Sequence, residues 1–104
     1  MSYAWVYILE CSDGSYYTGS TTDLEKRLEE HQRGEYDGYT ARRRPVKLLW
    51  FDDFPTYEQA FQFERQVKQW SRKKKEALMR NDFEALHELA RSTAIRQRLE
   101  MRSS

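Results

Sequence analysis

The most unusual position in the sequence is that of Glu64. The segment that begins at Tyr57 has helical periodicity, and Glu64 falls on the same side of the helical wheel as Ala60 and Val67. A carboxylate on the core side of a helix is costly to bury, so it needs a cation, a hydrogen-bond network or a bound metal ion. The alternative is an ion pair with Lys68 one turn further on, which contributes only about 0.2–0.5 kcal/mol on an exposed helix.

Four further side chains complete a set that suits phosphate-ester chemistry. Arg27 and His31 lie one turn apart beside the apolar stripe of a predicted helix, and Tyr7 and Tyr17 lie in two predicted strands. In such chemistry a glutamate holds a divalent cation, an arginine neutralises oxyanion charge, and a tyrosine or histidine transfers protons. Each residue alone is also an ordinary structural residue, so the hypothesis rests on all five converging on one cleft.

Basic residues are clustered, although the formal net charge is only +1. Residues 41–47 read ARRRPVK and residues 68–75 read KQWSRKKK, and neither run contains an acidic residue. Such runs attract phosphate backbones, and Tyr39 and Trp70 could stack on bases, although a charged run is also typical of solvated surface. The candidate nucleic-acid contacts in and beside these runs are Arg42, Arg43, Arg44, Lys47, Lys68 and Arg72.

A predicted β-hairpin positions the two tyrosines. Residues 3–10 are rich in aromatic and β-branched side chains, a second short strand covers 16–19, and residues 12–15 (SDGS) form a strong turn signal. A two-residue turn would place Tyr7 and Tyr17 on opposite faces of the hairpin. A three-residue turn with a left-handed glycine would place them on the same face. The residues alone are compatible with both registers.

Two predicted helices carry the other candidate residues. Thr22, followed three residues later by Glu25, forms a capping-box pattern that predicts a helix through about Arg33, with Gly34 as its stop. A long second helix is predicted over residues 57–80, where the apolar periodicity begins again after a proline.

The remaining segments complete a single α+β domain. Residues 34–44 are polar and turn-rich and are interpreted as an exposed loop, and a third strand is predicted over 46–51. Asn81, followed three residues later by Glu84, resembles a new helix start, so residues 81–104 are expected to form a C-terminal helix packed on the same domain. The alternative for that helix is binding to a partner or dimerisation.

Composition limits the class of protein. The length of 104 residues favours one compact domain, and 18 basic against 17 acidic residues exclude a uniformly basic nucleic-acid coat and an acidic tail. The single cysteine, Cys11, excludes an intrachain disulfide and a cysteine zinc site, which suits a reducing cytosol. The apolar run at residues 4–9 is too short for a membrane span and lacks the basic region of a signal peptide. We therefore expect a cytoplasmic protein with no membrane partner.

The order and spacing of these residues resemble one family. The tripeptides WVY at 5–7 and YTG at 17–19, ten residues apart, resemble the paired tripeptides that name the GIY-YIG endonuclease superfamily. The match continues with Arg27, His31 and finally Glu64 on a later helix. The chain resembles the small single-domain bacterial branch of that superfamily over about residues 3 to 80.

Three residues depart from the pattern of the family. Trp5 replaces the first glycine, Thr18 replaces the isoleucine of the second tripeptide, and Ser20 stands where some repair nucleases of the superfamily carry a lysine. None of these changes removes a proposed catalytic side chain. The sequence also contains no separate DNA-recognition domain, so the resemblance does not indicate a target.

The resemblance implies a three-stranded antiparallel sheet flanked by helices over residues 1–80, and metal-dependent hydrolysis of DNA phosphodiester bonds. Glu64 would be the sole protein ligand of Mg²⁺ or Mn²⁺. Tyr17 would deprotonate or orient the attacking water, assisted by Tyr7, and Arg27 would stabilise charge on the phosphate. DNA rather than RNA as the substrate rests on this resemblance alone.

The same scheme requires Tyr7 and Tyr17 on one face, and it therefore favours the three-residue turn, in which Tyr7 lies opposite Gly19. His31 is implied to be a second proton carrier or a phosphate contact. The alternative function is a non-catalytic nucleic-acid-binding module that keeps the nuclease fold. The absence of a targeting domain and the two basic runs motivate that alternative.

Overall fold

The computed structural model describes residues 4–81, which fall into two compact units with their boundary after Lys68. The first unit contains a three-stranded antiparallel sheet with strand order β2-β1-β3. Its strands are β1 (Ala4–Glu10), β2 (Tyr16–Thr21) and β3 (Lys47–Phe54). The predicted α+β class and the predicted sheet are confirmed.

The hairpin of β1 and β2 has the three-residue turn. The backbone N–H of Cys11 donates to the carbonyl of Ser15 at 2.8 Å, and the glycine of the turn is left-handed with φ +83°. Tyr7 pairs with Gly19, and Tyr17 pairs with the residue two positions further along β1. Because directly paired residues of antiparallel strands point to the same face, Tyr7 and Tyr17 lie on one face of the sheet. This register confirms the expectation drawn from the resemblance.

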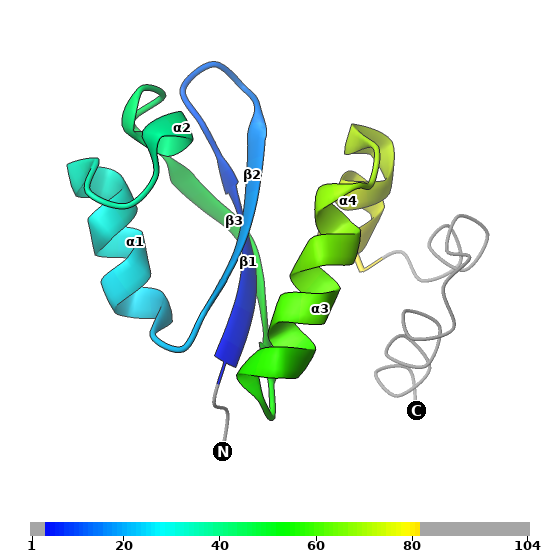
Figure 1. Cartoon of the computed structure of the whole chain (residues 1–104). Coiled ribbons are helices and arrows are strands. Elements are labelled where there is room, and N and C mark those ends of the chain that lie inside the picture. Colours follow the sequence, from blue (N-terminus) through cyan, green and yellow to red (C-terminus); the bar gives the residue numbers. More distant parts are fainter. Residues whose placement is uncertain (1–3, 82–104) are drawn as a thin grey trace. The chain divides into compact units, whose positions relative to one another are not determined.

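Helices cover both faces of the sheet (Figure 1). They are α1 (Leu24–Arg33) and α2 (Gly38–Ala41) on one face and α3 (Tyr57–Lys68) on the other. On the α1 face, Leu24 and Leu28 pack against a buried cluster that includes Tyr7 and Leu9. On the α3 face, aromatic rings of β3 and α3 lie 5.4 Å and 6.4 Å apart. Each face therefore has its own apolar layer.

Helix α1 begins one residue later than the sequence predicts. Its N-cap is Asp23 rather than Thr22, and the Asp23 carboxylate accepts the backbone N–H of Lys26 at 3.1 Å. The hydroxyl of Thr21 accepts the N–H of Asp23 at 3.0 Å, which fixes the turn before the helix and leaves the cap to the aspartate. The helix ends at Gly34, as predicted.

The segment over residues 34–44 contains a short helix, so its interpretation as an exposed loop throughout is wrong. Asp37 caps α2 by accepting the N–H of Tyr39 at 2.7 Å, and Thr40 in that helix is fully buried. A polar segment can form a helix here because its cap and one inward hydroxyl have partners. The third strand also continues to Phe54, beyond the predicted end.

The helix predicted over 57–80 is two helices. Thr56 caps α3 by accepting the N–H of Gln59 at 3.2 Å, but α3 ends at Lys68 and α4 (Arg72–Met79) begins after Ser71. The Ser71 hydroxyl caps α4, and this local bond competes with continuation of the preceding helix. Helix α4 belongs to the second unit. The helix predicted over 81–104 lies outside the described residues, except for its first position. Within residues 4–81, no helix is long and apolar enough to span a membrane.

Candidate active site

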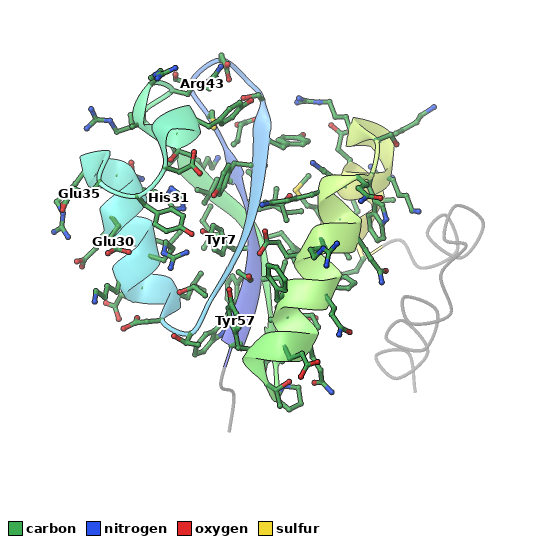
Figure 2. The ribbon with its side chains drawn as sticks, viewed as in Figure 1. Tyr7, Glu30, His31, Glu35, Arg43 and Tyr57 are labelled. Atoms are coloured by element: carbon green, nitrogen blue, oxygen red, sulfur yellow. The ribbon has the colours of Figure 1, made fainter. Side chains whose placement is uncertain are left out.

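Three aromatic rings form a cluster between α1 and the sheet. The ring centroids of Tyr7 and Tyr17 lie 6.4 Å apart. The centroid of the His31 ring lies 5.6 Å from that of Tyr7 and 5.1 Å from that of Tyr17. Figure 2 shows His31 extending from α1 toward the sheet, where Tyr7 lies, whereas Glu35 is directed away from it. The structure therefore brings three of the five predicted site residues into contact.

Gly19 makes room for the phenol of Tyr7. A Cβ atom at position 19 would lie 2.5 Å from Tyr7 Cζ and closer still to the hydroxyl oxygen. Non-bonded carbon atoms do not approach this closely, so any side chain at position 19 would push the phenol away from β2. The glycine of the second tripeptide thus sets the position of the tyrosine of the first.

A buried hydrogen-bond chain continues from Tyr7 into α2. The hydroxyl of Thr40 donates to the Asp37 carbonyl at 3.2 Å, so its oxygen is left to accept from His31 Nδ1 at 2.8 Å. His31 Nε2 then carries the lone pair and accepts from the Tyr7 hydroxyl at 2.8 Å. Burial lowers the pKa of His31 from 6.5 to about 4, so the ring is neutral at neutral pH. His31 is 0% exposed, so its ring lies inside the cluster and not at the surface.

Both phenols are protonated at neutral pH. Burial raises the pKa of Tyr7, and the hydrogen bond and charge of Arg27 oppose that rise. Burial also raises the pKa of Tyr17, with a further rise from the nearby Tyr7 and Asp37. The Tyr17 hydroxyl donates to Asp37 Oδ2 at 3.3 Å. Tyr17 is only partly buried, whereas Tyr7 is 0% exposed, so Tyr17 is the phenol closer to solvent.

Arg27 is held in place from several directions. Its Nη1 donates to the carbonyl of Ser20 and its Nε to Glu30 Oε1, both at 3.3 Å, and its guanidinium lies 3.7 Å from the ring centroid of Tyr36. Burial alone would lower the pKa of Arg27, but hydrogen bonds with Tyr7 and Glu30 and the nearby phenols raise it. The side chain remains 20% exposed. Arg27 is therefore a fixed cation that a ligand in solution can reach.

Glu64 lies on the other face of the sheet and is 6% exposed, so its predicted inward position is confirmed. The hydroxyl of Ser20 donates to Glu64 Oε1, and Lys68 Nζ lies 2.6 Å from Oε2. Burial of the Glu64 carboxylate and an ion pair with Lys68 are the two alternatives that the sequence leaves open. Both are present in the structure, because the Ser20 hydroxyl bonds one carboxylate oxygen and the Lys68 ammonium bonds the other.

Ser20 connects the two faces of the sheet. Its hydroxyl contacts Glu64 on α3, and its carbonyl accepts from Arg27 on α1. This is possible because β2 is an edge strand, whose outer backbone groups are free of the sheet. The charge of Glu64 also contributes to raising the pKa of Tyr7. The five predicted residues are thus grouped around the β2 edge, with the carboxylate on one face and the other four on the opposite face.

The donor set suits a metal ion held by a single carboxylate. Among residues 4–81 there is no group of three or more His, Cys, Asp or Glu side chains that could hold a metal ion. Mg²⁺ often keeps several waters and takes one or two carboxylates plus substrate phosphate, a requirement that Glu64 alone can meet. The hydroxyl of Thr18, on the same face of β2 as Ser20, is buried with no hydrogen-bond partner among residues 4–81 and could bond a water of such an ion.

Two of the predicted nucleic-acid contacts stabilise the fold. Arg43 Nε lies 3.0 Å from Asp13 Oδ2, and its guanidinium lies 3.8 Å from the ring centroid of Tyr39. Arg44 Nε donates to the carbonyl of Ala41 at 3.0 Å. These arginines tie the hairpin turn and α2 to the rest of the domain.

The other four basic candidates differ in their surroundings. Arg42 and Lys47 are exposed, and neither side chain has a partner within residues 4–81. Lys68 is paired with Glu64, as described above. Arg72 belongs to the second unit, where its Nε lies 3.3 Å from Glu76 Oε2. Of the six candidates, Arg42 and Lys47 are therefore the two whose side chains have no partner among residues 4–81.

Sequence reasoning missed four residues that complete the site: Ser20, Tyr36, Asp37 and Thr40. Asp37 followed by Thr40 is the spacing of a helix cap and its first turn, and that signal could have located α2. Ser20 was noted only as a departure from a family lysine. Nothing in the local sequence indicates that its hydroxyl meets a carboxylate 44 residues away.

This fold and side-chain set define a small α+β protein with tyrosines, an arginine and a glutamate at a sheet edge. The family model for the GIY-YIG catalytic domain matches residues 3–77, so the chain belongs to the GIY-YIG family. It is 49% identical over 76 residues to a UPF0213 protein of Haloquadratum walsbyi, covering 73% of this chain and 85% of that protein. It is 46% identical over 87 residues to a UPF0213 protein of Bacillus pumilus, covering 81% of this chain and 89% of that protein.

A solved structure is also similar. The solution NMR structure of a protein from E. faecalis has a TM-score of 0.52 and 35% sequence identity, covering 88% of this chain and 96% of that chain. The predicted family membership and fold class are confirmed by these comparisons.

Proposed function

We propose that the protein is a divalent-metal-dependent endonuclease that hydrolyses phosphodiester bonds in DNA. The observation that carries this proposal is the placement of Ser20, which holds Glu64 and Arg27 at one point of the β2 edge. A phosphate there meets a fixed cation on one side and a buried carboxylate on the other. Mg²⁺ or Mn²⁺ is the cofactor that this carboxylate would hold, and it would supply Lewis-acid charge to the phosphate.

Tyr17 is the phenol that acts on the attacking water. Its hydroxyl already donates to Asp37, so its proton can pass to that carboxylate while its oxygen takes a proton from water. The water becomes the hydroxide equivalent that forms the new P–O bond. The P–O bond on the far side breaks with its electron pair on the leaving oxygen, which takes up a proton from solvent while Asp37 returns its proton to solvent. Arg27 stabilises the charge that develops on the phosphate oxygens.

Tyr7 and His31 support this chemistry from the interior of the domain. Both are 0% exposed, so neither contacts a substrate directly. The Tyr7 hydroxyl gives its hydrogen to neutral His31 and holds Arg27 through its oxygen. They are therefore positioning residues for Arg27, while Tyr17, Arg27 and Glu64 are the catalytic residues.

The test is cleavage of single-stranded, nicked and branched DNA with Mg²⁺ or Mn²⁺. Glu64→Gln keeps the shape of the side chain but removes the charge that binds the cation, and we expect a loss of kcat of at least about a hundredfold. Glu58→Gln, at an exposed position of the same helix, is the matched control and should keep full activity. Full activity of Glu64→Gln would refute the metal assignment.

A second variant tests the proton path. Tyr17→Phe removes the hydroxyl that contacts Asp37, and we expect kcat to fall by about a hundredfold or more with little change in DNA affinity. A kcat equal to that of the wild type would show that the phenol of Tyr17 does not act on the water.

A non-catalytic nucleic-acid-binding module is the second candidate. It is favoured by one feature of the site, namely that both oxygens of Glu64 already have partners within the chain. This candidate predicts salt-dependent binding with no turnover under any metal. For either function, Arg42→Ala and Lys47→Ala should each weaken binding and reduce the salt slope by about one. Arg43→Ala should instead reduce stability, because Arg43 is bound to Asp13.

A further inference from the structure

Lys68 forms an ion pair with one of the two carboxylate oxygens of Glu64. The Lys68 ammonium lies 2.6 Å from Glu64 Oε2, and the Glu64 side chain is only 8% exposed, against 50% for Lys68. The hydroxyl of Ser20, from the sheet, closes the other oxygen. A second cation that binds Oε2 therefore has to compete with the ammonium for the carboxylate.

We propose that Lys68 is an exchangeable internal cation of the site. Its ammonium and a divalent cation compete for Glu64, and the released Lys68 side chain contacts a phosphate of the nucleic acid. The inference rests on the proposed function, because it takes Glu64 as the metal ligand.

Because Glu64 is buried, its carboxylate exchanges one cation for another and is not left without one. A carboxylate this buried is costly to leave unpaired, so one of the two cations has to accompany it. Lys68 is the last residue of α3 and is half exposed, so its ammonium regains water when it leaves. Ser20 holds Glu64 in both states, because its hydroxyl contacts the oxygen that Lys68 does not use.

The exchange also changes the charge offered to DNA. With Lys68 on Glu64, the two charges neutralise each other and contribute little to phosphate binding. With a divalent cation on Glu64, the positive charge of Lys68 becomes available near the catalytic residues. Metal loading and nucleic-acid binding are then positively coupled, and each strengthens the other by the same factor.

The first experiment measures Mn²⁺ affinity without nucleic acid, from the broadening of backbone amide NMR signals. Lys68→Met keeps most of the aliphatic chain and removes the competing ammonium. We expect Mn²⁺ to bind about threefold to sixfold more tightly, because a partly exposed ion pair of this kind occupies the carboxylate most of the time. Lys68→Arg should weaken Mn²⁺ binding, because a guanidinium pairs with a carboxylate more strongly. The control is Lys26→Met, which removes the same charge from an exposed position of α1 and should leave the affinity unchanged.

The outcomes separate this inference from the proposed function. If Glu64→Gln leaves Mn²⁺ affinity unchanged, Glu64 is not the metal ligand and the proposed function fails. If Glu64→Gln abolishes Mn²⁺ binding but Lys68→Met and Lys68→Arg bind as the wild type does, only the exchange is refuted. The two Lys68 variants predict opposite signs, so either one alone decides the question if the other does not fold.

The second experiment measures DNA binding by fluorescence anisotropy, in chelator and with Ca²⁺. In chelator, the salt slope of DNA binding by Lys68→Met should equal that of the wild type, because the wild-type ammonium is held by Glu64 and contacts no phosphate. With Ca²⁺, the variant should bind more weakly, and its salt slope should be lower by about one. An equal drop of the salt slope in both conditions would make Lys68 an ordinary phosphate contact and would overturn the release step.

Discussion

The close approach of Tyr7 to Gly19 gives a prediction that can be worked out from geometry. Alanine at position 19 would place a Cβ 2.5 Å from Tyr7 Cζ and nearer still to the hydroxyl, so the phenol has to move. Overpacking a core of this kind costs about 1–3 kcal/mol. Movement of the hydroxyl also breaks its bond to His31, which is worth about 0.5–1.5 kcal/mol. We therefore expect Gly19→Ala to lower the free energy of unfolding by about 1.5–4.5 kcal/mol.

The assay is urea denaturation followed by tyrosine and tryptophan fluorescence, with Gly38→Ala as the matched control. A Cβ at Gly38 meets nothing within 4 Å, and Gly38 is the first residue of α2. Alanine there should be neutral or stabilise the protein by up to about 1 kcal/mol. The ¹⁵N shift of His31 Nε2 reports the loss of the Tyr7 hydrogen bond independently of stability.

A double-mutant cycle isolates the contact. Tyr7→Leu removes the ring atoms that the new methyl group would meet, so the cost of Gly19→Ala should fall by at least about 1 kcal/mol in that background. Two results would refute the reasoning: a Gly19→Ala protein as stable as the wild type, or the same cost in both backgrounds. Either would show that the phenol does not lie across β2 as described.

Three further predictions concern stability. Neutral His31 has a pKa of about 4 in the fold, against 6.5 when exposed, so the unfolded chain takes up a proton first as pH falls. Stability should therefore drop by up to about 3 kcal/mol between pH 6.5 and 4, and a His31→Gln variant, followed by urea denaturation across that range, should lack this part of the drop. Asp23→Ala should cost about 1 kcal/mol in thermal unfolding and Thr22→Ala much less, since Asp23 is the cap of α1. Thr18→Val should raise the unfolding free energy by about 1 kcal/mol in urea, because it removes a buried hydroxyl that has no partner in the described part of the chain.

Features that depend on residues near one another could be predicted from the sequence. The inward position of Glu64 follows from helical periodicity, and the pairing of Tyr7 with Gly19 follows from a turn whose length the family pattern selects. One local signal, the helix cap at Ser71, is missed by the prediction of a single helix over residues 57–80. Ser71 starts a new helix where apolar periodicity suggested continuation, because a capping hydroxyl within hydrogen-bond reach outweighs a weak helical preference.

Features that depend on distant residues could not be predicted. The bond between Tyr7 and His31 spans 24 positions, and the bond between Ser20 and Glu64 spans 44. Neither partner of such a bond has a local signature, because a serine in a strand and a histidine on a helix are common. The ion pair of Arg43 could not be predicted for the same reason, since its partner Asp13 lies 30 positions away.

The contact of Arg27 with the Ser20 carbonyl also bears on the solubility of the protein. β2 is an edge strand, and an edge strand with free backbone groups is a template for pairing with another chain. Arg27 bonds one of those backbone carbonyls and places a charge beside it. Both effects oppose pairing of β2 with a strand of a neighbouring molecule. Loss of this arginine would therefore promote aggregation through the β2 edge as well as impair the site, and the yield of monomer after purification would report the first effect separately.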